Sequence, residues 1–159
     1  MANELCGEDD AVDSPAGIRA AVRLSDEYVL RALRLINDLA GGELLTAIIF
    51  RAIIAGNIGY LDANTAEAAP YSDMATLPPD HMRRPVSVLS VADSLGLPYE
   101  TTRRHVRKLI KAGHCRREGR GVIAPATALT GPASEAAMHA NLANLRRLFR
   151  GLNRAGVDL

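Results

Sequence analysis

The chain has 159 residues, of which 48% are hydrophobic and 23% charged, and its formal net charge is +1. That length suffices for one cored domain with helical extensions or two very small domains, and excludes a larger assembly of domains; we expect the single unit. The amino terminus lacks the basic region and the apolar region that a signal peptide contains. This excludes a signal peptide and predicts a cytoplasmic protein.

Residues 1–24 form a polar segment that is rich in acids. Its carboxylates are Glu4, Glu8, Asp9, Asp10 and Asp13. Pro15 and Gly17 follow them, so we expect a disordered acidic tail, with residues 18–24 as a helical or extended arm. A solvated run of charge is the default interpretation of such a tail.

Two helices are expected next. The first begins at Ser25 and stops at Gly41, with an apolar stripe of Val29, Leu30, Leu33, Ile36 and Leu39. The second covers about residues 43–57 and carries Leu44, Leu45, Ile48, Ile49, Ile53 and Ile54. It is shorter than the ~20 apolar residues that cross a bilayer and contains Arg51, so we expect a buried core helix and no membrane span.

The stretch from 59 to 84 is longer than an ordinary loop and holds Pro70, Pro78 and Pro79. We interpret it as an insertion or a mobile connector. At its end, residues 84–86 could supply a short strand that pairs with a later hairpin.

Residues 86–113 contain two short amphipathic helices joined by a glycine turn. The inward residues of the first are Val88, Val91, Ala92 and Leu95, behind a cap at Ser87 or Ser90. Gly96 supplies the positive φ that commonly ends a helix, and Leu97 returns to the core. Pro98 opens the second helix, whose buried stripe is Thr102, Val106, Leu109 and Ile110.

A hairpin is predicted directly after the second helix. Residues 114–118 and 122–124 flank the turn Gly119-Arg120-Gly121. The adjacent His114 and Cys115 should point to opposite faces of their strand.

A last helix is predicted over about 134–152, within a carboxyl-terminal segment of residues 131–159. Its apolar residues are spaced by four, three, four and three: Met138, Leu142, Leu145, Phe149 and Leu152. This is an a/d seam of about two heptads, and we favour a dimerisation helix. A helix that folds back on its own domain would show the same stripe.

The two helices and the hairpin in residues 84–124 resemble the winged helix-turn-helix transcriptional regulators of bacteria, a group that includes the MarR, ArsR, GntR and IclR families. The resemblance does not choose among those families. It implies a mainly α fold with a small β-hairpin wing, in a domain of residues 25–130 with amino- and carboxyl-terminal helical extensions. In such proteins the second helix enters the major groove, and the wing reaches a neighbouring groove or phosphates.

Carried over by position, the resemblance implies DNA contacts from the helix at 98–111 and from the wing at 114–124. The residues are Tyr99, Thr101, Arg103, Arg104, Arg107, Lys108, Arg116, Arg117 and Arg120. We expect Arg103 and Arg104 at or near bases, and Tyr99 and Thr101 on phosphates at the amino end of the helix. The remaining cations would hold the DNA backbone.

The charge distribution supports this interpretation. Residues 83–120 hold ten basic and three acidic residues, a net charge of +7, whereas residues 1–82 carry five basic and thirteen acidic residues, or −8. A compact basic block is an electrostatic footprint for phosphates. Alone, it could equally be a solvated basic face.

Catalytic and metal-binding patterns are poor. His81, His105, His114 and His139 form no HxxxH pair, and no glycine-rich nucleotide loop or nucleophile elbow occurs. We therefore expect no enzyme, no cofactor and no metal. Cys6 and Cys115 are the only cysteines, so a structural disulfide is not expected and a redox switch is a minor option.

The sequence thus predicts a homodimeric bacterial transcriptional regulator that binds double-stranded DNA. A small-molecule effector could bind between the amino-terminal helices and the last helix, near Ile49, Ile53 and Phe149. The alternatives are a winged-helix module that docks an acidic partner or its own acidic tail, and a nonspecific DNA-binding protein. Deletion of residues 1–17 tests whether the acidic tail masks the basic face. If it does, the deletion should raise the affinity for DNA at low salt.

Overall fold

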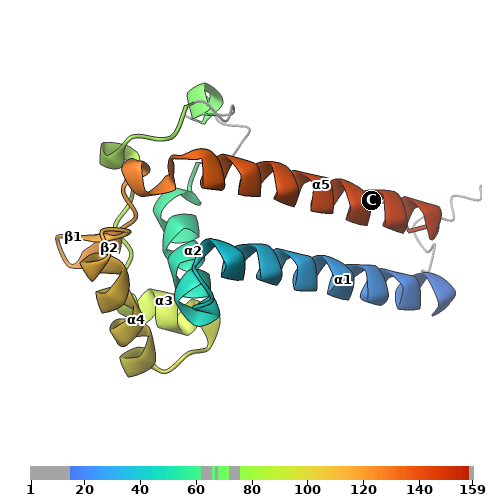
Figure 1. Cartoon of the computed structure of the whole chain (residues 1–159), viewed down its shortest axis with the longest axis horizontal. Coiled ribbons are helices and arrows are strands. Elements are labelled where there is room, and N and C mark those ends of the chain that lie inside the picture. The colour runs from blue at the N-terminus through green and yellow to red at the C-terminus, as the bar shows by residue number, and fades with distance from the viewer. Residues whose placement is uncertain (1–14, 62–65, 67, 72–75, 158–159) are drawn as a thin grey trace, which may run out of the picture. The chain divides into compact units, whose positions relative to one another are not determined.

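The structure is a computed structural model that describes residues 15–61, 66, 68–71 and 76–157. Its helices are α1 (Pro15–Leu39), α2 (Leu44–Ile58), α3 (Val88–Leu95), α4 (Tyr99–Lys111) and α5 (Pro132–Arg154), shown in Figure 1. The strands β1 (Arg116–Glu118) and β2 (Gly121–Ile123) form one antiparallel hairpin. Short 3-10 turns lie at Ala69–Tyr71, Asp80–Met82 and Ala126–Leu129. The expectation of a mainly α fold with a small β-hairpin is confirmed.

These elements divide into two compact units. Leu33–His139 forms the larger unit, which contains α2, α3, α4 and the hairpin. The described residues up to Ala32 and from Ala140 onward form the smaller unit. Helices α1 and α5 therefore each contribute residues to both units.

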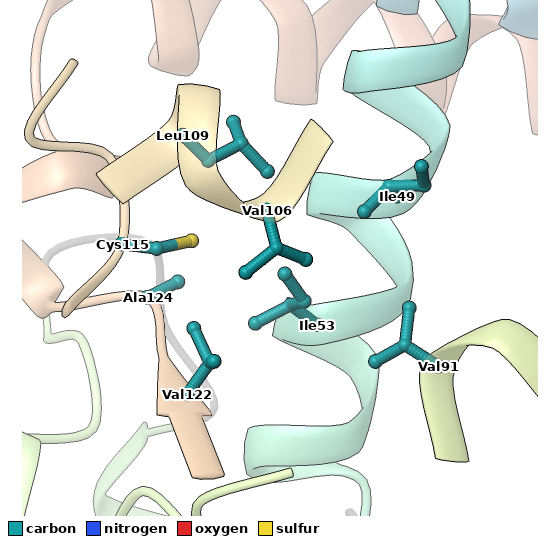
Figure 2. Close-up of a cluster of buried hydrophobic side chains, with 8 residues drawn as sticks. All are labelled: Ile49, Ile53, Val91, Val106, Leu109, Cys115, Val122 and Ala124. Carbon is teal, nitrogen blue, oxygen red and sulfur yellow. The ribbon is translucent and has the colours of Figure 1, made fainter. Parts of the chain in front are cut away.

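Helix α2 is the core helix of the larger unit and contacts α3, α4 and β2. Ile49 and Ile53 on α2 are 0% exposed and belong to one apolar cluster with Val91 of α3, Val106 of α4 and Val122 of β2 (Figure 2). Complete burial of an aliphatic side chain stabilises a fold by about 1.5–3 kcal/mol. Of the apolar residues expected to face inward on α3 and α4, all but Ala92 pack in or against this cluster, and Ala92 is buried.

The connection from α3 to α4 follows the sequence closely. Ser87 caps α3, and its Oγ accepts a 2.9 Å hydrogen bond from the Ser90 N–H. Gly96 ends the helix at a φ of +62°, and the Leu97 N–H donates to the Ala92 carbonyl at 3.0 Å. Pro98 stands immediately before α4 rather than inside its first turn.

The hairpin pairs Arg117 with Val122 around a two-residue turn, in which Gly119 has a φ of +57°. The first strand is shorter than predicted, and the second begins and ends one residue earlier than predicted. The predicted pairing of residues 84–86 is confirmed as a single bridge, because Val86 and Val122 exchange backbone hydrogen bonds of 3.1 and 2.9 Å. This bridge ties the segment before α3 to β2.

The start of α1 differs from the prediction. The helix begins at Pro15, well before Ser25, so the proposed separate arm at residues 18–24 is wrong. Residues 18–24 contain no helix breaker, and proline fits the first turn because its missing N–H needs no partner there. The predicted acidic tail over residues 1–14 lies outside the described residues.

The end of the 59–84 stretch makes buried polar contacts. Pro78 is buried, and the buried guanidinium of Arg83 donates from Nη2 to the Pro78 carbonyl at 3.0 Å. The Asp80 carboxylate accepts the Ala126 N–H at 2.8 Å. These contacts tie residues 78–83 to one another and to the segment after β2.

In the smaller unit, α1 and α5 run antiparallel. Leu24 packs so closely on Gly151 that a Cβ there would lie 2.8 Å from Leu24 Cδ2, and the Tyr28 hydroxyl donates to Asn141 Oδ1 at 3.4 Å. No single helix in the described ranges is long and apolar enough to cross a membrane, and α1 with α2 meets that criterion only as a bent pair.

Candidate nucleic-acid interface

Helix α4 has two faces of different chemistry. Thr102, Val106 and Leu109 are at most 4% exposed and anchor the helix in the core. The exposed cations include Arg104, Arg107 and Lys111, and none of these three has an ion pair within the described part of the chain. This face can therefore accept anions without first breaking an internal contact.

Arg103 is committed within its own helix. Its Nε and Nη2 donate to Glu100 Oε2 at 3.0 and 2.7 Å. Both Arg103 and Arg104 were predicted to lie at or near bases. Of the two, only Arg104 has no ion pair within the described part of the chain. The spacing of three residues between Glu100 and Arg103 could have revealed this pair in the sequence.

Lys108 is held by Glu43, the residue immediately before α2. Its ammonium group lies 3.1 Å from both carboxylate oxygens of Glu43. The predicted phosphate contact from Lys108 therefore competes with an existing ion pair, in which both side chains are about half exposed. Sixty-five positions separate the two residues, so no local pattern could have indicated the contact.

A short relay connects this ion pair to His105. The Thr46 hydroxyl donates to Glu43 Oε2 at 2.7 Å and lies 2.7 Å from His105 Nδ1. A hydroxyl has one hydrogen, so a Thr46 that donates to Glu43 must accept from a protonated Nδ1. The hydrogen bond from Thr46 and then the Lys108 contact lower the pKa of Glu43. Burial, followed by the charges of Arg104 and Lys108, lowers the pKa of His105.

The hairpin also carries both paired and unpaired arginines. Arg116 contacts Asp80 at 3.1 Å and Glu118 at 2.9 Å. The backbone N–H of Ala126 is the main cause of the lowered Asp80 pKa, with Arg116 contributing further. Arg117 and Arg120 are exposed and have no ion pair among the residues that the structure describes.

The remaining predicted contact residues lie at the start of α4. Tyr99 is 44% exposed, and Thr101 is half-buried. Arg83, which contributes to the +7 of residues 83–120, has a side chain with no exposure and so adds nothing to an accessible cationic face.

Of the nine predicted DNA-binding residues, the structure therefore leaves four arginines exposed and without ion pairs in the described ranges. These are Arg104, Arg107, Arg117 and Arg120. Three others are paired with acids: Arg103, Lys108 and Arg116. The predicted set of DNA contacts left out Lys111, which is exposed and has no ion pair among the described residues, and it did not consider the acids Glu43, Asp80 and Glu100.

Two further expectations need correction. Ile49 and Ile53 lie inside the core at 0% exposure, so they cannot line the proposed effector pocket. Cys115 is buried, and burial raises the pKa of its thiol to about 12. A thiol in that state is unreactive, which removes Cys115 as a redox switch.

Within the described ranges, no group of three His, Cys, Asp or Glu residues is placed to hold a metal ion. Comparisons with protein-family models, with curated proteins and with solved structures give no match to the chain.

Proposed function

We propose that the protein is a homodimeric winged helix-turn-helix transcriptional regulator of the bacterial type that binds double-stranded DNA. In this proposal α3 and α4 are the helix-turn-helix, α4 enters the major groove, and β1 and β2 are the wing. The observation that carries the proposal is the division of α4 into a core-anchored face and a face with unpaired Arg104, Arg107 and Lys111. The bend at Gly96 and the hairpin after α4 supply the expected order of elements.

Arg104 is the leading candidate for a base contact. It is exposed on α4, and arginine can donate two parallel hydrogen bonds to the O6 and N7 of guanine. Arg107 and Lys111 lie farther along the same helix and would contact phosphates. Tyr99 and Thr101 stand at the amino end of α4, where backbone N–H groups also favour phosphate.

The paired cations would act differently. Arg103 must exchange Glu100 for DNA before it can contact a base, so part of its binding energy offsets the lost ion pair. Lys108 ties α4 to Glu43 at the start of α2, and Arg116 ties β1 to Asp80. These two ion pairs position the unpaired arginines around them. Arg117 and Arg120 of the hairpin would hold flanking phosphates.

Binding to DNA from upstream of the protein's own gene tests the proposal. The purified protein is titrated by fluorescence anisotropy against random competitor DNA at two salt concentrations. We expect binding that survives the competitor and weakens with salt, since each neutralised phosphate releases counterions. Weak binding that random DNA abolishes would favour a nonspecific binder, and absence of binding would favour a module that docks an acidic protein.

A further inference from the structure

Part of the apolar seam of α5, at Leu142 and Phe149, stays exposed beside the contact with α1. The residues of α5 that touch α1 include Asn141 and Gly151. At 3.6 residues per turn, Leu142 and Phe149 lie roughly a quarter turn or more away from that face. They are 42% and 52% exposed, so this part of the seam is free to pack on something else.

Helix α1 likewise has a second apolar face. Leu24 and Tyr28 point toward α5, whereas Ile18, Val22 and Leu30 are 50%, 56% and 66% exposed. These three residues line a shallow surface groove together with Asp26, Arg19 and the paired Arg23 and Glu27. Ile18 and Val22 are rotated from the α1–α5 contact in the same sense as Leu142 and Phe149, and in antiparallel helices such residues lie on one side of the pair.

The charges beside the two faces are different. Helix α5 carries Arg146, Arg147, Arg150 and Arg154 after its single acid, Glu135, and none of these arginines forms an ion pair in the described ranges. Asp26 on α1 has no ion pair there either. Two α5 helices packed on each other would oppose cation to cation, whereas α5 on α1 brings arginine near Asp26.

The heights of these residues along the helix pair also agree. Asp26 lies between Leu24 and Tyr28, and their contacts on α5 are Gly151 and Asn141. The level of Asp26 thus corresponds to the α5 segment that contains Arg146. A two-fold axis parallel to the helices keeps residues at their level, so it would place Arg146 of one copy beside Asp26 of the other.

We infer that the exposed face of the α1–α5 pair binds a second copy of this chain, with α5 of each copy on α1 of the other. Phe149 enters the groove of Ile18, Val22 and Leu30 in the partner copy, and Arg146 pairs with the partner copy's Asp26. The inference deepens the proposed function, because it rests on the homodimer and specifies how the two copies meet. It needs no DNA.

Sedimentation equilibrium of the full chain without DNA tests this arrangement by charge exchange. We expect a wild-type dimer, and a dimer dissociation constant that rises at least about tenfold in Asp26→Arg and in Arg146→Asp. The double variant should return to within about threefold of wild type. Arg147→Asp is the matched control, since Arg147 lies on α5 roughly opposite the seam and should leave the constant unchanged.

Several outcomes would overturn the inference. These are a monomer at high concentration, a dimer tightened by Arg146→Asp, which would indicate α5 against α5, or a double variant no better than the single ones. Phe149→Ala provides an independent check and should weaken the dimer without changing the circular dichroism of the monomer. A dimer that obeys the charge exchange but binds no DNA would contradict the proposed function and leave this interface intact.

Discussion

Asn57 Oδ1 accepts a 2.8 Å hydrogen bond from the backbone N–H of Ala124, which joins α2 to the residue directly after β2. The Nδ2 of the same side chain donates to the carbonyls of Arg84 at 2.8 Å and Val122 at 3.0 Å. Asn57 is 0% exposed, so no water can replace these partners without a change in packing. This side chain fixes the hairpin to the core helix.

Replacement of Asn57 by Ala should therefore destabilise the larger unit strongly. It would leave the buried Ala124 N–H without a partner, at about 1–3 kcal/mol, and would remove one hydrogen bond each from the Arg84 and Val122 carbonyls, at about 0.5–1.5 kcal/mol each, although the Val122 carbonyl keeps the Val86 N–H. We expect a loss above about 3 kcal/mol in the free energy of unfolding, measured by urea denaturation. The exposed Asn153→Ala is the control, and an Asn57→Ala loss no larger than that of the control would contradict the assigned role.

Gly96 should be replaceable only at a conformational cost. No atom lies within 4 Å of a Cβ built at this position, so its φ of +62° is the sole source of strain. Gly96→Ala should cost roughly 1–2 kcal/mol, and Gly96→Asn less, because asparagine tolerates the left-handed region. Denaturation of both variants gives the order, and equal stability of Ala and Gly would show that the turn is relaxed.

Cys115 should be unreactive in the folded protein. Its thiol is buried and its pKa is raised to about 12, so almost no thiolate exists at pH 8. In a Cys6→Ser background, we expect a thiol reagent to label Cys115 only after urea is added. Rapid labelling of the native protein at pH 8 would mean that the core around Cys115 opens readily.

The free energy of unfolding should fall as the pH drops from the ordinary histidine pKa of 6.5 through the lower pKa that His105 has in the folded protein. The folded state disfavours the charged imidazole, so the unfolded state binds more protons in this pH range. A lower pH therefore stabilises the unfolded state relative to the folded state. The stabilisation by neutral His105 is complete above pH 6.5. His105→Gln, which keeps a donor for Thr46, should remove that part of the pH dependence of urea midpoints. A profile identical to wild type would exclude His105 as its source.

The helical part of the fold was predictable because local signals agree. The serine cap, the glycine turn and the spacing of Thr102, Val106 and Leu109 all indicate the same two helices. The start of α1 was missed because Ser25 followed by acids is a good cap pattern, while the helix continues backward through residues without a breaker. A local cap signal cannot show that an earlier start is available.

The charged surface was predictable only in part. Sequence gives the number of cations on α4 and the hairpin, and it contains the near spacing of Glu100 and Arg103. It does not indicate that α2 brings Glu43 to Lys108, or that the end of the 59–84 stretch brings Asp80 to Arg116. These long-range ion pairs decide which cations remain unpaired, and only the folded chain reveals them.

The Glu100–Arg103 pair gives a prediction about DNA binding. Glu100→Gln would remove the charge that holds Arg103 and would also remove an anion from the face that meets DNA. We expect tighter binding by a few fold at low salt, with a smaller gain at high salt because exposed charges are screened. Anisotropy titrations at two ionic strengths measure it. Weaker binding by this variant would mean that Glu100 itself assists recognition.

The most direct measurement is the DNA affinity of Arg104→Ala beside that of Arg34→Ala, an exposed arginine of α1 that serves as the matched control. On the specific site, the account predicts a loss of about 1–3 kcal/mol for Arg104→Ala, a much smaller loss on random DNA, and no change for the control. If Arg104→Ala binds the specific site as tightly as wild type, α4 is not the element that reads DNA.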